Sequence, residues 1–309
     1  GWVRQLGSNG QLDWVEAGEY AMDPVLPIQS INLHDLHKAA SFPFEQKVTF
    51  FHAKLATLRV PWEHGHVPIK VNRGKRLEDS FGLFRRLKGE DLRRIFRFSF
   101  IGEPAQEAGG VAREWFLLIS EEIFNLDFGL FEYGAADDLC YAINPASGIA
   151  NDHHLEYFNF AGRFLGKCLF DRQHCSAHLT FTLIKHLLGW PIMLRDLEQI
   201  DLQLWTSLQA LMETDNPEDL CLDFTVGLNK FGEVAVEELK RGGEDMPVTK
   251  ENRVEYAELL LRHLVFERMR MQLVALLQGF YEVIPPPLLS IFDPNEFELL
   301  LCGLPNIDV

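Results

Sequence analysis

The amino-acid sequence predicts an α+β fold in which helices predominate and strands are few and short. Three observations support this prediction. Apolar residues make up 47% of the 309 residues, which is ample for a buried core. Apolar side chains recur at spacings of three and four over much of the chain, as they do in amphipathic helices. Strict alternation of apolar and polar residues, the pattern of a half-buried strand, is confined to short runs.

Residues 1–41 are predicted to be a loosely organised N-terminal extension. The segment GWVRQLGSNGQLDWVEAGEYAMDP at its start faintly resembles a WW module, with Trp2, a Ser-Asn-Gly turn, Trp14 as the central aromatic residue and a closing Asp-Pro. The second signature tryptophan of that module is missing. The alternative is an irregular lead-in that packs on the main domain.

Regular elements are predicted from Phe42 onward. The pattern indicates a helix over residues 44–58. Two strands are predicted over residues 67–71 and 96–100, because apolar and polar residues alternate there. Residues 103–110 are predicted to form a loop that a glycine pair closes.

Helices dominate the sequence after this loop. A helix is predicted over residues 114–124 and another over residues 154–170. The first has a predicted buried face of Trp115, Leu118 and Ile119 and a predicted solvent face of Ser120, Glu121 and Glu122. The second repeats apolar side chains at Phe158, Ala161, Leu165 and Cys168.

Three more helices are predicted toward the C-terminus. A wide apolar stripe indicates a helix over residues 178–188, and Gly189 ends it. A long helix is predicted over residues 250–279, with Thr249 as its N-cap. The start of the last helix is marked by a capping box with Asp293 as the cap, Pro294 at the first position and Glu296 reaching back.

The net charge of −16 restricts the classes of partner. Nucleic acids and anionic membranes are themselves negative, so neither is predicted to bind. A basic protein partner suits the charge better, although excess acid also serves solubility. The sequence shows no apolar run of membrane-spanning length and no signal peptide, so a cytoplasmic or nuclear location is expected.

The five cysteines are widely spaced and odd in number, which indicates reduced thiols rather than a disulfide framework. Four of them, Cys140, Cys168, Cys221 and Cys302, lie in apolar sequence and are predicted to be core residues. Cys175 lies in the polar segment DRQHCSAH, so it is either an ordinary surface cysteine or a reactive thiol. No zinc spacing or phosphate-binding loop is found, and we predict no metal and no cofactor.

Residues 176–226 form a compact block that is rich in large apolar side chains. The side chains concerned are Leu183, Leu187, Trp190, Leu204, Trp205, Leu208 and Phe224. A block this short cannot bury them all by itself. Either they pack on the larger domain as shared core, or they leave a groove that receives a partner's aromatic anchor.

Four blocks of sequence, in order and at matching spacing, resemble the HECT family of ubiquitin ligases. They read GGVAREWFLLISEEIFNLDFGLFEY, INPASGIANDHHLEYFNFAGRFLGK, FGEVAVEELKRGGEDMPVTKENRVEY and GFYEVIPPPLLSIFDPNEFELLLCGLP. The resemblance covers residues 42–309, close to the full N-lobe of that family's bilobal domain. The closing LLLCGLPNIDV resembles the last helix and the beginning of the hinge. The lobe with the catalytic cysteine would follow, so we expect this chain to lack it and assign no catalytic residue.

The resemblance implies a large helical subdomain, residues 42–175 and 227–309, and a small inserted subdomain, residues 176–226. In this family the small subdomain docks the ubiquitin-conjugating enzyme (E2) through a hydrophobic groove that receives a phenylalanine. By position, the lining is expected to be Leu183, Leu187, Leu194, Leu204, Leu208 and Phe224.

The WW-bearing members also hold a second ubiquitin on the N-lobe. The two aromatic contacts fall here on Phe128 and Phe231, and the first of these is more often tyrosine in that subgroup. A second departure lies in the loop GEPAQEAGG, where Glu107 and Ala108 replace an Asp-Tyr pair. The protein substrate is expected to bind through regions outside this chain.

The implied function is to position a ubiquitin-charged E2 so that a cysteine of the second lobe can take the ubiquitin and pass it to a substrate lysine. One alternative is a non-catalytic module that recruits or sequesters E2. A third reading is a cysteine enzyme that uses Cys175. In the third reading the thiol would react readily near neutral pH, whereas in the first two it would not.

Overall fold

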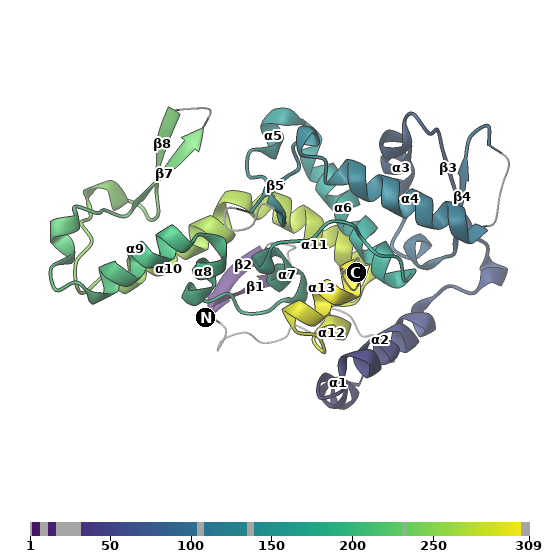
Figure 1. Cartoon of the computed structure of the whole chain (residues 1–309), viewed down its shortest axis with the longest axis horizontal. Helices are drawn as coiled ribbons and strands as arrows, with labels where there is room; N and C mark the ends of the chain where they lie inside the picture. Colours follow the sequence, from purple (N-terminus) through teal and green to yellow (C-terminus); the bar gives the residue numbers. More distant parts are fainter. Residues whose placement is uncertain are drawn as a thin grey trace, which may run out of the picture.

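The computed structural model describes residues 2–6, 12–16, 32–103, 108–134, 139–230 and 233–303. The α-helices are α1 (Leu33–Ala40), α2 (Phe44–Leu58), α3 (Arg76–Phe84), α4 (Ala108–Ile123), α5 (Ser147–Ala150), α6 (His154–Phe170), α7 (Phe181–Leu188), α8 (Leu197–Ile200), α9 (Leu202–Glu213), α10 (Arg253–Val265), α11 (Arg270–Val283), α12 (Pro286–Leu289) and α13 (Pro294–Cys302). The strands of the described residues form four separate two-stranded sheets: β1 (Trp2–Leu6) with β2 (Leu12–Glu16), β3 (Val67–Val71) with β4 (Phe96–Phe100), β5 (Phe131–Tyr133) with β6 (Tyr141–Ile143), and β7 (Thr225–Lys230) with β8 (Glu233–Glu238). Helices therefore dominate, and the predicted α+β, mainly helical class is confirmed (Figure 1).

Helices α6 and α11 form the centre of the molecule and pack on each other more extensively than any other pair of helices. Their backbones approach so closely that side chains are excluded at the crossing. A Cβ atom on Gly162 would lie 2.0 Å from the carbonyl oxygen of Leu276, and one on Gly279 would lie 2.0 Å from that of Asn159. On each of the two helices, one glycine therefore lies directly against the backbone of the other helix.

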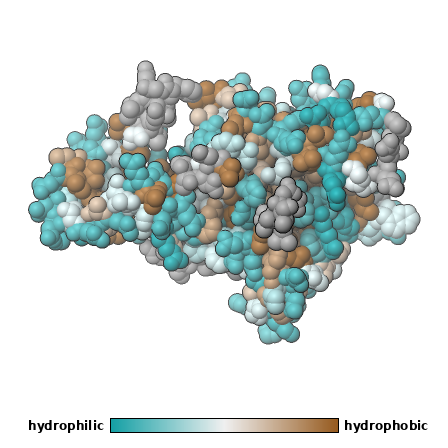
Figure 2. Space-filling model, in the orientation of Figure 1, coloured by the Kyte–Doolittle hydropathy of each residue, from teal (hydrophilic) through white to brown (hydrophobic). Residues whose placement is uncertain are grey.

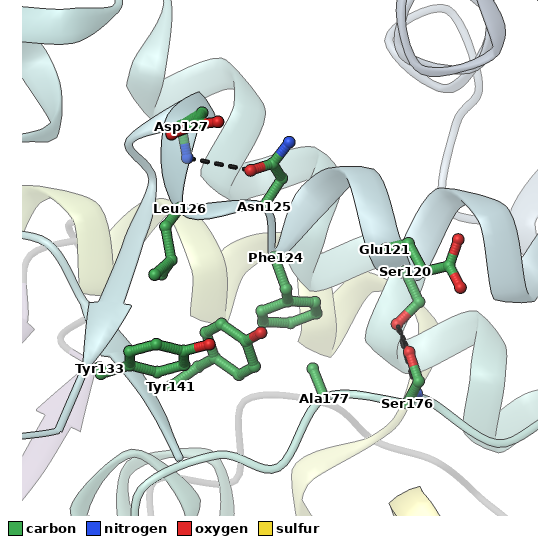
Figure 3. A pocket seen from close by; sticks show the side chains of 10 residues that line it. All are labelled: Ser120, Glu121, Phe124, Asn125, Leu126, Asp127, Tyr133, Tyr141, Ser176 and Ala177. Carbon is green, nitrogen blue, oxygen red and sulfur yellow. Dashed lines mark hydrogen bonds between the residues drawn. The ribbon is translucent and has the colours of Figure 1, made fainter. Parts of the chain in front are cut away.

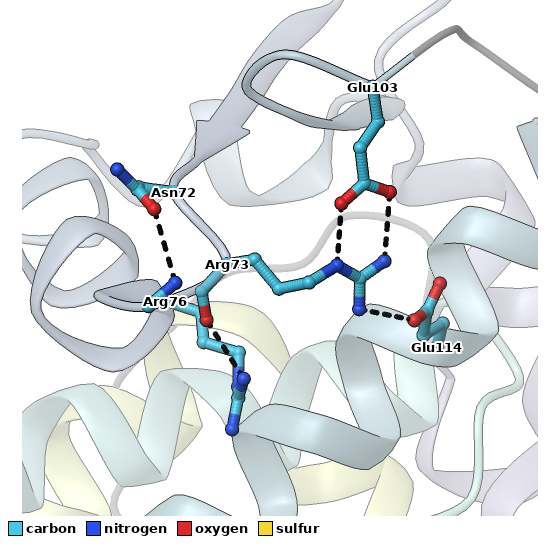
Figure 4. A network of polar contacts seen from close by, with 6 residues as sticks. Asn72, Arg73, Arg76, Glu103 and Glu114 are labelled. Atoms are coloured by element: carbon cyan, nitrogen blue, oxygen red, sulfur yellow. Dashed lines mark hydrogen bonds and ion pairs between the residues drawn. The ribbon is translucent and has the colours of Figure 1, made fainter.

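The parallel pair β3–β4 lies at one end of the body beside α3 and α4, with Ile69 opposite Phe98. A surface network ties this end together (Figure 4). The guanidinium of Arg73 donates to both carboxylate oxygens of Glu103, at 2.6 and 2.9 Å, and to Glu114 at 2.6 Å. These hydrogen bonds lower the pKa of Glu103 and raise that of Arg73. The network therefore links the end of β3 to the segment after β4 and to α4.

Several predicted elements agree with the structure residue for residue. They are α2, β3, β4 and α6. The capping box of α13 is also confirmed, because the Asp293 carboxylate accepts from the Glu296 N–H at 2.9 Å and the Glu296 carboxylate accepts from the Asp293 N–H at 3.0 Å. Gly189 ends α7 with φ of 73°, as predicted.

The predicted long helix over residues 250–279 is wrong, because it is two helices separated at Phe266. Neither glycine nor proline causes the break. The carbonyl of Val265 instead accepts from the imidazole of His186 at 2.8 Å, and the carbonyl of Leu264 accepts from Arg268 Nε at 2.8 Å. A tertiary contact from His186 and a local one from Arg268 thus satisfy the end of α10. Thr249 is not the N-cap either, since that position belongs to Asn252, whose side chain accepts from the Thr249 N–H.

Two further helix starts differ from the prediction. The helix predicted over 178–188 begins at Phe181, because Thr180 and His178 pair with the backbone of Tyr141 and keep the preceding residues extended. Helix α4 begins at Ala108, so the glycine pair lies in its first turn rather than closing a loop. Ser120 on this helix is fully buried, in contrast to its predicted place on the solvent face.

The N-terminal extension contains a hairpin, β1–β2, and the helix α1, which the sequence pattern did not reveal. The side chain of Asn32 caps α1 by accepting from the His34 N–H at 3.0 Å. An ion pair of 3.4 Å joins Asp13 of the hairpin to Arg270 of α11. The remainder of the segment that resembles a WW module lies outside the described residues, so that resemblance stays a prediction.

A projecting block extends from the body at one end (Figure 1). We define it as α8, α9, the hairpin β7–β8 and the N-terminal part of α10. The predicted limit of the small subdomain, between residues 226 and 227, falls inside this hairpin. The division into subdomains remains a prediction, although the hairpin itself continues to Glu238. Within the described part of the chain, no helix is both long enough and apolar enough to cross a membrane.

Candidate functional site

Four of the six residues expected to line an E2 groove lie in the interior. Leu183, Leu187, Leu208 and Phe224 are buried. Leu194 and Leu204 are half-buried, and both pack against the core. In the uncomplexed chain the six side chains therefore do not form one open groove. Their role in docking stays a prediction, and any surface that a partner touches must include other residues.

Phe224 is a core residue of the projecting block, with none of its surface exposed. The Lys240 ammonium lies 3.9 Å from the centre of its ring, and the ring of Tyr256 meets it edge to face at 5.5 Å. Its N–H donates to the carbonyl of Gly243 at 3.1 Å. These contacts come from the segments after β8 and from α10, so Phe224 joins the hairpin to the rest of the block.

Leu187 lies on α7, which the body holds firmly. The Tyr281 hydroxyl on α11 donates to the Leu187 carbonyl at 2.7 Å. The imidazole of His186 donates to the Val265 carbonyl at 2.8 Å, as described above. Helix α7 is thus fastened to both helices of the α10–α11 pair, and the buried Leu187 contributes to that junction rather than to the surface.

Other apolar side chains of the same region are exposed. Trp190 is 39% and Leu202 60% exposed, and Met193 and Leu220 are exposed as well. Figure 2 shows apolar surface on the outer end of the block within a mostly hydrophilic face. Trp190 is one of the large apolar side chains named from the sequence, and Leu202 could have been found because it directly follows the Asp201 N-cap of α9.

A cavity of about 610 Å³ lies where the block meets the body, and Leu183 is the only one of the six predicted residues in its wall. Two charged residues, Glu132 on β5 and Arg268 between α10 and α11, line this cavity. Burial raises the pKa of Glu132 and lowers that of Arg268, and each charge partly offsets the effect of burial on the other. The cavity is therefore a mixed apolar and charged recess.

Phe128, the first predicted ubiquitin contact, is half-buried at the end of a short turn, Leu126–Phe128. Its ring meets the ring of Tyr157 edge to face at 4.9 Å. The second predicted contact, Phe231, lies outside the described residues.

The other side of the Phe128 turn borders a cleft of about 500 Å³ (Figure 3). Tyr133 is 45% exposed in its wall, and its ring lies 5.3 Å from that of Tyr141. Asn125 accepts from the Asp127 N–H at 3.0 Å and so shapes the rim. The cleft thus offers an open aromatic wall next to Phe128, which reasoning from the sequence missed because Tyr133 and Tyr141 meet only through the β5–β6 pairing.

Comparison with known proteins gives a consistent result. The family model described as "HECT-domain (ubiquitin-transferase)" matches residues 117–309. The chain is 38% identical to the human E3 ubiquitin-protein ligase NEDD4 over 271 residues, which are 86% of this chain and 20% of that protein. It is 39% identical to the E3 ubiquitin-protein ligase RSP5 of Emericella nidulans over 266 residues, or 86% and 32% of the two chains.

The chain belongs to the HECT family. A further relative, the Drosophila melanogaster E3 ubiquitin-protein ligase Smurf1, is 39% identical over 80% of this chain and 23% of its own length. The chain thus spans between a fifth and a third of the length of these three HECT relatives. HECT ligases are transferases that work with an E2 and ubiquitin.

The cysteines of this HECT chain differ from the sequence-based expectations in two places. Cys175 is buried, so the predicted surface position is wrong. In its segment, the exposed His174, Ser176 and His178 alternate with buried residues. The polar neighbours therefore suggested a surface position, although the Cys175 side chain points inward. Cys221, predicted to be in the core, is exposed.

The remaining thiols of the HECT chain are partly or fully buried. Burial raises the pKa of Cys168 well above its usual value and also raises the pKa values of Cys175 and Cys302. A hydrogen-bond contact of 3.3 Å joins the Cys175 Sγ to the Ser120 Oγ. Among the residues that the structure describes, no cluster of three or more histidine, cysteine, aspartate or glutamate residues could hold a metal ion.

Proposed function

We propose that this chain binds a ubiquitin-charged E2 on the projecting block and the turn that leads into it, and thereby holds the carrier for transfer of its ubiquitin. The observation that carries the proposal is the exposure of the four apolar side chains described above, Trp190, Met193, Leu202 and Leu220. Exposed apolar and aromatic side chains on a hydrophilic surface are typical anchors of protein interfaces. Membership of the HECT family supplies the class of partner.

In this proposal the buried residues act as support. The buried Leu187 and Phe224 hold α7 and the hairpin in place. The half-buried Leu194 and Leu204 pack against the core and support the segments that carry the exposed side chains. An E2 would then meet Trp190 and Met193 first, because they are exposed on the turn between α7 and α8.

Titration of a ¹⁵N-labelled E2 with the unlabelled chain tests the proposal. Trp190→Ala is expected to weaken binding about tenfold or more, as truncation of an aromatic anchor does. Trp62→Ala is the matched control, because Trp62 is 72% exposed on the body and outside the block. Equal affinities of the two variants for several E2 enzymes would contradict the proposal, provided that both keep the thermal midpoint of the unmodified chain.

We also infer that the aromatic cleft beside Phe128 binds ubiquitin non-covalently. Support comes from the exposure of the Tyr133 ring and from the fact that Leu126 and Asp127, which precede Phe128 in its turn, line the same cleft. Aromatic rings with one polar end suit an interface because they bury area and still offer a hydrogen-bonding group.

Titration with free ubiquitin separates this inference from E2 docking. Tyr133→Ala is expected to weaken ubiquitin binding and to leave the affinity for uncharged E2 unchanged, whereas Trp190→Ala should do the reverse. Binding of ubiquitin that is indifferent to Tyr133→Ala and to Phe128→Ala would place the contact elsewhere on the chain.

A module that only recruits or sequesters E2 would use the same docking surface. The two functions differ in what happens to the bound thioester. When the chain is joined to the rest of a HECT domain, a transferase discharges the E2 in proportion to docking, so Trp190→Ala slows discharge. A sequestering module protects the thioester, and the same substitution then speeds discharge to other acceptors.

A further inference from the structure

An ion pair lies inside the root of the proposed docking surface. The Lys185 Nζ on α7 contacts the Asp196 Oδ2 at 2.6 Å, and each side chain is only 7% exposed. The Lys185 ammonium also lies 4.9 Å from the centre of the Phe181 ring. The two charged residues close the turn that runs from Gly189 to Asp196.

The same carboxylate organises the backbone of this turn. Asp196 Oδ2 accepts from the Met193 N–H at 2.8 Å, and the Asp196 N–H donates to the Met193 carbonyl at 2.9 Å. At the other end the Trp190 N–H donates to the Lys185 carbonyl at 2.9 Å. Backbone bonds to the two charged residues therefore fix both ends of the turn.

Between these fixed points one side chain is buried and two are exposed. Ile192 is buried at 1% and anchors the middle of the turn, whereas Trp190 and Met193 on either side of it are exposed. The turn thus presents two large apolar side chains in one defined conformation, although neither side chain is itself held by the core.

A buried ion pair is a costly way to stabilise a fold, because both ions lose their hydration. Well-packed apolar side chains of similar volume often serve stability equally well. The best-supported benefit of such a pair is geometric, since it selects one arrangement of the segments that carry the charges. Here those segments are α7 and the turn that bears Trp190 and Met193.

We propose that Lys185 and Asp196 are positioning residues for E2 docking, which set the turn 189–196 so that Trp190 and Met193 meet the E2. The proposal rests on the proposed docking function. It names two residues that would not touch the E2 and that act through the two exposed ones.

The test replaces the pair without leaving an unpaired charge. In Lys185→Met/Asp196→Leu both charges and the acceptor for the Met193 N–H are removed. We expect the variant to stay folded, the Met193 amide to exchange with solvent faster, and the affinity for E2 to fall about tenfold. Combined with Trp190→Ala, the two losses should be less than additive, because both remove the same contact.

A milder variant covers the case in which the first one does not fold. Lys185→Gln/Asp196→Asn removes both charges but keeps polar side chains and an oxygen that can accept from the Met193 N–H, so we expect a smaller loss of affinity in the same direction. The matched control is Lys47→Met/Glu296→Gln, which removes another largely buried pair, of 2.7 Å, from the body and retains a capping group on α13. This control should leave the affinity for E2 and the Met193 exchange rate unchanged.

The outcomes separate this proposal from the function on which it rests. If the unmodified chain binds no E2, the docking function fails and the positioning role fails with it. If the unmodified chain binds and a folded pair variant binds equally well, only the positioning role is overturned. A loss of affinity that adds fully to that of Trp190→Ala would also overturn it, since the pair would then act elsewhere.

Discussion

At the scale of single residues, the interior of the projecting block is decided by contacts that come from distant segments. Phe224 and Leu187 are apolar in the sequence and could equally belong to a groove or to a core. Tyr256 and Lys240 cover Phe224, and the Tyr281 hydroxyl on α11 fixes the backbone of the fully buried Leu187. The apolar residue type therefore predicted that these side chains are buried in a core or in an interface. Which of the two applies depends on neighbours up to about a hundred residues away in the sequence.

Phe224→Ala is expected to destabilise the chain by about 3–5 kcal/mol, because it deletes a fully buried ring and leaves a cavity. Urea denaturation followed by circular dichroism gives the loss. Leu220→Ala, at a residue that is 50% exposed in the same block, should change stability by no more than about 0.5 kcal/mol. Similar losses for the two variants would show that Phe224 is not packed as described.

A second prediction concerns His52 on α2. Burial, with a smaller contribution from the nearby Arg172, lowers its pKa from 6.5 to about 4. The unfolded chain therefore takes up a proton on His52 more readily than the folded chain between these pH values, and stability is lost as the pH falls from about 6.5 to about 4.

His52→Gln removes this proton uptake. We expect the drop in unfolding free energy over that pH interval to be smaller in the variant, by about 1–2 kcal/mol after allowance for solvent screening. Urea denaturation of both proteins at a series of pH values measures the difference, and carboxylates that titrate in the same range cancel in the comparison. Parallel curves for the two proteins would refute the assignment.

At the scale of elements, the bounds of helices and strands were predicted correctly where the signal lies within a few neighbouring residues. They were predicted wrongly where tertiary contacts determine the bound. The alternation in β3 and β4 and the Asp293 capping box are complete within a few residues, and both agree with the structure. The end of α10 depends in part on a distant residue, since His186 on α7 supplies the donor for the Val265 carbonyl, whereas the Arg268 bond to the Leu264 carbonyl is local. The candidate site follows the same rule, because the Tyr133–Tyr141 wall exists only once β5 and β6 pair.

The crossing of α6 and α11 provides a test at this scale. In Gly162→Ala the new methyl group would lie 2.0 Å from the Leu276 carbonyl oxygen, so the helices must separate. We expect a loss of stability of about 2–4 kcal/mol, as for other overpacked contacts. Gly82→Ala is the matched control, because that glycine lies within α3 and a Cβ atom there meets nothing within 4 Å.

The control substitution should leave stability unchanged or raise it by up to about 1 kcal/mol, because alanine favours helix over glycine. Thermal unfolding of the two variants beside the unmodified chain is sufficient. A Gly162→Ala protein as stable as Gly82→Ala would mean that the two central helices are farther apart than described.

At the scale of the whole molecule, the chain combines a central body with a projecting block, and two of its described thiols lie deep in the body. Cys168 and Cys175 are buried with raised pKa values, which disfavours the thiolate that attacks a thioester. Cys221 is exposed and directly follows Leu220 of the proposed docking surface, so a substitution at Cys221 must accompany any test of thiol reactivity.

We therefore expect that the chain, incubated with a ubiquitin-charged E2, forms no ubiquitin adduct that a reducing agent removes. Non-reducing gel electrophoresis with and without thiol checks this. Cys221→Ser serves as the control for the most accessible thiol. A reducible adduct would refute this expectation; its loss in Cys221→Ser would identify Cys221 as the acceptor, and its persistence would point to one of the other four cysteines.

The break at Phe266 has a mechanical consequence for anything carried on the block. Helix α10 has 13 residues, so its far end lies about 20 Å from the break. A rotation of about 10° at this single joint would displace that end by about 3 Å while every helical hydrogen bond stays intact. A small rotation at the joint between α10 and α11, where the buried Phe266 lies, would thus move the block on which we propose that the E2 binds.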